Sequence, residues 1–232
     1  MLDHIDDYSF EITFKAEELY FLAAQQAFQQ ATTLRDEVLT KGHEYSLTEL
    51  LLFAKVYDLG DEIDPDVDVS DFDETKKDLQ EALDLFTLAT TSVDIYTVMT
   101  LEAHINAIAD SQFSKTTRDY FDRLSLEGKW FFAPQLIGLV RVFDKGKEPF
   151  QSFKAVIQRR NGVVHTKGEG RVVILSDKAA PEDYMAEKFT QAKSALCAAC
   201  SMVTELAKAL NIAAPAWVKG DLPEHYVVGN RL

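Results

Sequence analysis

Residues 181–210 read PEDYMAEKFTQAKSALCAACSMVTELAKAL, and their apolar side chains recur at alternating spacings of four and three. The repeat consists of Met185, Phe189, Ala192, Leu196, Ala199, Val203, Leu206 and Leu210. This spacing keeps the apolar side chains on one face of an α-helix, and Pro181 suits the first turn. The stretch therefore predicts a long amphipathic helix whose stripe lies in a bundle core or in a seam between two chains.

The N-terminal part of the chain predicts two more helices. A similar repeat consists of Tyr20, Ala24, Ala27, Ala31, Leu34 and Val38, and Lys41-Gly42 is expected to end that helix. A shorter helix is expected from about Ser46, which with Glu49 forms a capping box, to near Gly60. The stretch EIDPDVDVSDFDE then predicts an acidic connector, because Pro65 interrupts it.

The middle of the chain has no glycine or proline between Pro65 and Gly128. Asp73 is a good N-cap for a helix that begins at about residue 74. The hydroxyl cluster at 90–92, followed by Asp94, is expected to end this helix and to cap another that runs to about residue 110. The sequence thus predicts two helices here.

Two shorter helices are expected further along, at about 115–123 and 149–164, with the bulky apolar cluster Trp130, Phe131 and Phe132 between them. RVVILS at 171–176 is a short β-branched run that predicts one strand, paired in a hairpin or with a second copy. The tail from Pro215 is expected to be irregular. We therefore predict one all-α helical-bundle domain over residues 1–232, with one short strand or hairpin.

The composition excludes several classes of protein. The 232 residues carry a net charge of −14, which argues against coating nucleic acid by bulk attraction. Residues 58–84 hold twelve acids against two lysines, whereas residues 129–178 hold ten cations against four acids. No apolar stretch is long enough to predict a membrane span, and the N-terminus does not resemble a signal peptide. A cytoplasmic protein without membrane association is expected, with an anionic ligand possible at the basic segment.

Two patterns resemble metal or redox sites but fit them poorly. Asp64, Asp66 and Asp68 match ligand positions of an EF-hand loop, yet Val69 stands where glycine is needed and Thr75 where glutamate is needed. A solvated charge run is the simpler interpretation.

Cys197 and Cys200 form a CxxC inside a strong helix pattern, so we expect buried small side chains rather than a redox pair. GxGxxG, GxxxxGK[ST], GxSxG and HExxH are all absent. No cofactor and no metal are expected.

The stretch QRRNGVVH at 158–165 combines a fixed cation, an amide and a group that titrates near neutrality: Arg160, Asn161 and His165. Arginine can hold two phosphate oxygens and offset the charge of a pentacoordinate transition state. Histidine can take a proton from an attacking hydroxyl or give one to a leaving oxygen. Such a set suits a phosphodiester, although on composition alone a helix end with a surface arginine and a capping histidine is the better explanation.

RRNGVVH resembles the Arg-x4-His motif of the HEPN superfamily, in which a polar residue, frequently asparagine, follows the arginine. LEAHINAIAD resembles an "EAFINEL"-like helix of bacterial HEPN-like proteins, with Glu102 and Asn106 at its polar positions. These two are four apart and lie on one helix face. The resemblance covers about residues 92–168.

The resemblance implies a helical bundle that dimerises and brings two Arg–His motifs together. It implies a metal-independent endoribonuclease that cleaves single-stranded RNA by attack of the 2′-hydroxyl, in a toxin–antitoxin or defence system. Arg160 and His165 would be catalytic, Asn161 would orient the phosphate or the histidine, and Glu102 and Asn106 would support Arg160. The alternative is a catalytically inactive HEPN-like interaction module bound to an antitoxin or a defence-complex partner.

Overall fold

The computed structural model describes residues 15–40, 70–164 and 181–219. Within these ranges the helices are α1 (Ala16–Thr40), α3 (Ser70–Gln112), α4 (Lys115–Phe121), α5 (Leu126–Leu136), α6 (Phe150–Val164), α7 (Pro181–Leu210) and the 3₁₀ helix η1 (Ala216–Lys219). The predicted all-α class is confirmed. The predicted helix at 46–60, the EF-hand-like aspartates and the strand at 171–176 lie outside the described residues.

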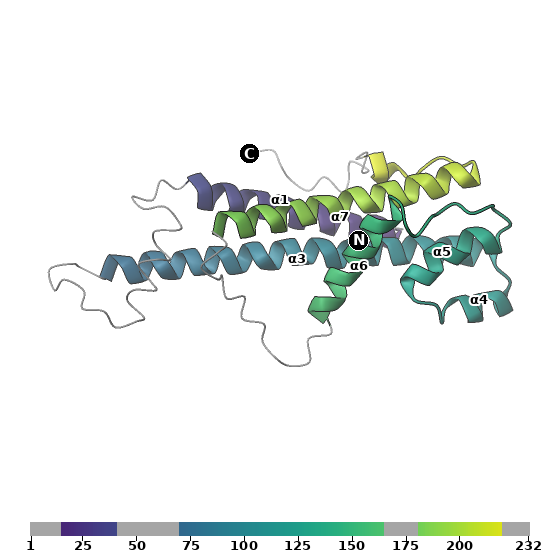
Figure 1. Ribbon diagram of the computed structural model, residues 1–232, viewed down its shortest axis with the longest axis horizontal. Coiled ribbons are helices and arrows are strands. Elements are labelled where there is room, and N and C mark those ends of the chain that lie inside the picture. Colours follow the sequence, from purple (N-terminus) through teal and green to yellow (C-terminus); the bar gives the residue numbers. More distant parts are fainter. Residues whose placement is uncertain (1–14, 41–69, 165–180, 220–232) are drawn as a thin grey trace, which may run out of the picture.

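The three longest helices, α1, α3 and α7, lie side by side along the long axis of the molecule (Figure 1). Helix α6 crosses them at a steep angle, and α4 and α5 lie near the C-terminal end of α3 (Figure 1). The apolar stripe of α7 is buried against the chain's own helices, with Met185, Ala192 and Leu206 each about 1% exposed. Of the two places predicted for the stripe, a bundle core or a seam between two chains, the structure shows the bundle core.

Helix α3 is continuous, so the predicted break at residues 90–92 is wrong. Thr90 Oγ1 donates to the Phe86 carbonyl at 3.0 Å, and Ser92 Oγ donates to the Leu88 carbonyl at 2.8 Å. A hydroxyl that bonds to the preceding turn is compatible with a helix interior, and here no cap is formed. The helix also begins at Ser70, so Asp73 lies inside it rather than at its N-cap.

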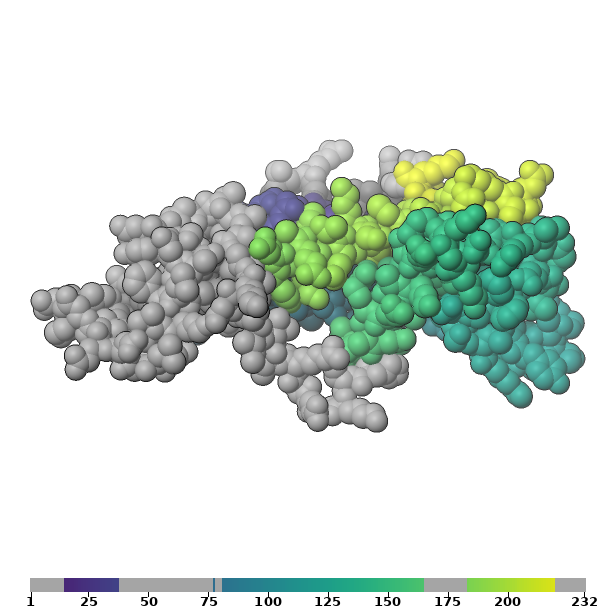
Figure 2. Space-filling view, viewed as in Figure 1, coloured from purple at the N-terminus to yellow at the C-terminus, as the bar shows by residue number. Residues whose placement is uncertain are grey.

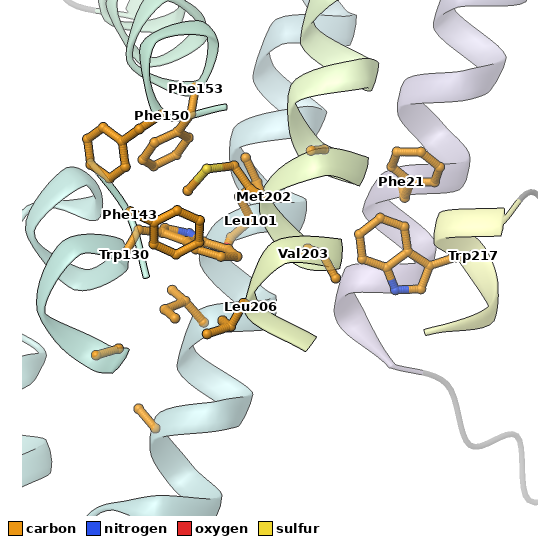
Figure 3. Packing of buried hydrophobic residues seen from close by; sticks show 14 of the residues in the cluster. Phe21, Leu101, Trp130, Phe143, Phe150, Phe153, Met202, Val203, Leu206 and Trp217 are labelled. Carbon is orange, nitrogen blue, oxygen red and sulfur yellow. The ribbon is translucent and has the colours of Figure 1, made fainter. Parts of the chain in front are cut away.

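The apolar cluster at 130–132 lies in helix α5, which places Trp130 at the centre of the core. Ser125 caps this helix, since its Oγ accepts a hydrogen bond from the Gly128 amide at 3.2 Å. Trp130 is fully buried, and its Nε1 donates to the Leu101 carbonyl of α3 at 3.2 Å. Figure 3 shows its indole beside Phe143, below Phe150 and Phe153 of α6. This core fixes α5 and α6 against α3.

The end of the described chain is anchored by a second tryptophan. Trp217 lies in η1, is only 1% exposed and packs against Phe21 of α1, with ring centroids 4.6 Å apart (Figure 3). The tail was expected to be irregular, but Ala216–Lys219 form one 3₁₀ turn that seats this side chain. Burial of a large aromatic ring offsets the entropy lost in ordering the segment.

We predict that Trp217→Ala destabilises the protein by about 3–5 kcal/mol, the usual cost of removing a buried aromatic side chain. Urea denaturation followed by circular dichroism measures this. Val140→Ala is the control, because Val140 is 91% exposed and should change stability by less than about 0.5 kcal/mol. Equal midpoints for the two variants would show that the tail does not hold the bundle.

Candidate functional site

The motif residues occupy the last two turns of α6. Gln158 to Val164 are helical, and the helix continues through Gly162. His165 follows directly and lies outside the described residues. Figure 2 shows α6 at the molecular surface below α7. The side chains on this exposed end of α6 are therefore positioned by the part of the helix that enters the core.

Arg160 continues the buried stripe of α6. Phe150, Phe153 and Val156 are fully buried, and Arg160 stands four residues after Val156, on the same face. Its Nη1 donates to Asn161 Oδ1 at 3.1 Å, whereas its Nε is buried and has no hydrogen-bond partner among the described residues. The structure thus brings Arg160 and Asn161 together and leaves one buried donor of the guanidinium unused.

Arg159 holds the motif helix to α3. Its Nε and Nη2 donate to the two carboxylate oxygens of Asp94, both at 2.7 Å, and Nη2 also donates to the Gln191 carbonyl of α7 at 3.2 Å. Burial raises the pKa of Asp94, and the hydrogen bonds and charge of Arg159 act in the opposite direction. Two short parallel bonds fix the rotation of α6 about its own axis.

Glu102 and Asn106 belong to a different cluster from Arg160. Lys129 of α5 is only 5% exposed; its Nζ donates to Asn106 Oδ1 at 3.1 Å and lies 3.6 Å from Glu102 Oε1. Among the described residues, no hydrogen bond or ion pair joins either residue to Arg160. The two residues do share a helix face, as predicted, but the cation they meet comes from the neighbouring helix α5.

Three buried polar residues were not predicted from the sequence: Lys129, His104 and Asp94, which pairs with Arg159. Asp94 had been assigned to a helix cap, and Lys129 and Arg159 had been counted only as charges of the basic segment. The available signal was position, because His104 comes three residues after Leu101 and one before Ile105, both of which are buried on α3. A polar residue on such a stripe is buried with its neighbours.

His104 lies among aromatic rings and is neutral in the folded protein. Its ring is stacked on Trp130 and meets Trp217 edge-on, with centroids 6.1 Å away in both cases. Its Nδ1 is buried without a hydrogen-bond partner in the part of the chain that the structure describes. Burial, with a smaller contribution from the charge of Lys15, lowers the pKa of His104 from 6.5 to about 4. His104 therefore serves packing rather than proton transfer at neutral pH.

The cysteines differ from expectation in their burial. Cys197 is exposed and Cys200 is half-buried, so the prediction of two buried side chains is wrong for Cys197. Burial raises the pKa of Cys200 to about 11, which keeps this thiol protonated. A thiol in that state is a poor nucleophile, so Cys200 is not suited to nucleophilic chemistry at neutral pH.

Among the described residues, no three histidine, cysteine, aspartate or glutamate side chains gather in a way that could hold a metal ion. None of the described helices is long and apolar enough to cross a membrane. No protein-family model matches the chain, and neither the curated proteins nor the solved structures contain a match. Proposals about function therefore depend on the geometry around α6 and on the motif itself.

We predict that His104 makes the protein less stable in acid. The pKa of His104 in the folded protein is about 4, below the ordinary value of about 6.5. The free energy of unfolding therefore keeps its full value above pH 6.5 and decreases as the pH falls toward 4. The loss amounts to about 3 kcal/mol over this interval. His104→Phe should remove that part of the slope, because phenylalanine keeps the ring packing but does not titrate.

Urea denaturation of both proteins at pH 7 and pH 4.5 measures the difference. The contribution of the other titrating groups cancels in this comparison because both proteins contain them. An identical pH slope for the two proteins would contradict the assignment of a depressed pKa to His104.

Proposed function

We propose that this chain is a HEPN-like metal-independent endoribonuclease that cleaves single-stranded RNA as a homodimer, in a toxin–antitoxin or defence system. The observation that supports the proposal most strongly is the state of Arg160. A buried N–H without a partner costs free energy, so such a group calls for a physical explanation. A phosphate oxygen that accepts from the guanidinium would give this cation a partner.

In the proposed reaction Arg160 holds the scissile phosphate. The 2′-hydroxyl of the preceding ribose attacks phosphorus, the bond from phosphorus to the 5′-oxygen breaks, and the guanidinium offsets the negative charge of the pentacoordinate state. Asn161 Oδ1 accepts from Arg160 Nη1 and orients the guanidinium. His165 takes the proton of the 2′-hydroxyl or gives one to the departing 5′-oxygen. The products are a 2′,3′-cyclic phosphate and a 5′-hydroxyl.

The second candidate is a catalytically inactive interaction module. The ion pair of Arg159 with Asp94 favours it, since that pair shows that a cation of this segment can have a purely structural role. The two candidates differ in what Arg160 does, and substitution of this residue separates them.

We predict RNA cleavage in the presence of EDTA, with a 2′,3′-cyclic phosphate on the 5′ fragment. His165→Ala should lower the rate by about a hundredfold or more, the usual scale for loss of a general acid or base. Arg160→Lys should abolish cleavage and leave the melting temperature unchanged, because lysine keeps the charge but lacks the second donor. Gel analysis of a labelled oligonucleotide measures the rate and the end groups.

Arg159→Lys is the matched control on the neighbouring residue. It loses one of the two bonds to Asp94, so the melting temperature should fall while the folded fraction keeps its cleavage activity. If Arg160→Lys lowers the melting temperature as much as Arg159→Lys does, Arg160 is structural and the inactive module is the better interpretation. Cleavage that disappears in EDTA would contradict the metal-independent mechanism.

We also predict a homodimer, because each chain contributes one motif histidine and the proposed reaction uses both an acid and a base. Sedimentation equilibrium at micromolar concentration should give twice the chain mass of 26.1 kDa. Mixing Arg160→Lys with an inactive His165→Ala chain tests whether the two sites act together. A monomer with full activity would exclude a site shared by two chains.

A further inference from the structure

The CxxC motif of α7 plays no part in the proposed function. The sequence predicted that both of its cysteines are buried, but Cys197 is exposed and Cys200 is half-buried. The pair is therefore open to solvent at Cys197, whereas Cys200 packs against the edge of the large apolar cluster. Two accessible thiols three residues apart are a ligand set that soft metal ions prefer.

Core packing fixes the spacing of the two thiols. Both cysteines lie in the interior of α7, whose 30 residues are all helical. Ala198 and Ala199, which stand between them, are 3% and 0% exposed, so the backbone that carries the pair is held against the bundle. Side chains three residues apart share one face of a helix, with Cβ atoms about 5–6 Å apart. Burial, and after it the charge of Cys197, raises the pKa of Cys200, as expected for thiol groups this close.

This spacing suits a bridging metal ion better than a disulfide. A disulfide needs Cβ atoms about 3.5–4.5 Å apart, so it would have to distort α7 where Ala198 and Ala199 pack in the core. Two metal–sulfur bonds of about 2.3 Å each hold the sulfur atoms up to about 4.6 Å apart. Sulfur atoms at that separation fit on Cβ atoms about 5–6 Å apart, which is the spacing of an undistorted helix.

The number of ligands selects the kind of metal ion. Among the described residues, no group of three or more histidine, cysteine, aspartate or glutamate side chains is placed to hold a metal ion. The pair therefore offers two ligands. Structural zinc sites use four protein ligands, and calcium and magnesium prefer oxygen. Monovalent copper is soft, prefers sulfur and is satisfied by two thiolates in a linear arrangement.

The surroundings of the pair suit the charge of such a complex. Copper(I) displaces one proton from each of the two thiols, and the resulting bis-thiolate complex carries one negative charge. Lys193 stands four residues before Cys197, one turn away on the same face of α7. It is exposed, so its ammonium group can offset that charge. The exposure of Cys197 provides the entry path for the ion.

We propose that Cys197 and Cys200 form a two-coordinate site for one monovalent copper ion, which both sulfur atoms bind on one face of α7. The site uses neither Arg160 nor the rest of the motif, so it is independent of RNA cleavage. Because the helix already spaces the ligands, binding should leave the helix content of the protein unchanged.

Titration of the full chain with copper(I) bicinchoninate, in the absence of oxygen, tests the proposal, because transfer of the ion to the protein removes the colour of the complex. One ion should bind per chain. Cys197→Ser and Cys200→Ser should each weaken binding by about a hundredfold or more, since loss of even an outer-shell partner costs about 10–100-fold. Zinc chloride should not compete, because two ligands do not complete the coordination of zinc.

The double variant Cys197→Ser with Ser201→Cys is the matched control, since Ser201 is exposed. It keeps two thiols, but at adjacent positions that do not face each other on a helix, so it should bind copper(I) as weakly as Cys197→Ser alone. X-ray absorption at the copper edge should show two sulfur neighbours in the unaltered protein. Circular dichroism should give the same helix content with and without the ion.

The proposal is overturned if the unaltered protein takes no copper(I) from bicinchoninate, or if either single variant binds the ion as tightly as the unaltered protein does. It is also overturned if the double variant keeps full affinity, because the spacing would then not matter, or if zinc binds as tightly as copper(I). A protein that binds copper(I) at this pair but cuts no RNA refutes the proposed function and leaves the copper site standing.

Discussion

Helix α3 runs for 43 residues without a break, which corresponds to about 65 Å of continuous helix. Each of the other described α-helices contacts it. Its buried residues also join the three apolar clusters, from Leu83 and Phe86 through Val93 to Leu101 and Ile105. A bend in the middle of α3 would move these clusters relative to one another. The hydroxyl groups of Thr90 and Ser92 bond within the helix and form no cap, so α3 stays continuous there.

The ion pair of Asp94 with Arg159 fixes the position of α6 relative to α3. It lies beyond the apolar contacts of Phe153 and Val156, and with them it determines which way each side chain of α6 faces. As a result, Arg160 falls at the end of the buried stripe with an unused donor.

Three cations of the basic segment have partners within the protein. Lys129 meets Glu102 and Asn106, Lys145 lies 3.5 Å from Glu127, and Arg159 is bound to Asp94. An excess of cations in the sequence therefore does not amount to a basic surface of the same size. Recognition of an anion would depend on a few cations with particular geometry, as proposed for Arg160, rather than on net charge, which is −14 for the chain.

The sequence by itself determined the all-α class, the course of α1, α4, α6 and α7, and the proximity of Arg160 to Asn161, because helical periodicity and neighbouring positions are local properties. It did not determine that α3 is continuous, since a hydroxyl can cap a helix or bond within one, and only the packing along α3 selects between them. Nor did it show that Lys129 meets Glu102 and Asn106, or that Asp94 meets Arg159. Those partners are 27, 23 and 65 residues apart in the chain. Only the tertiary structure brings them together, because each pair depends on how two helices pack and not on the spacing within either one.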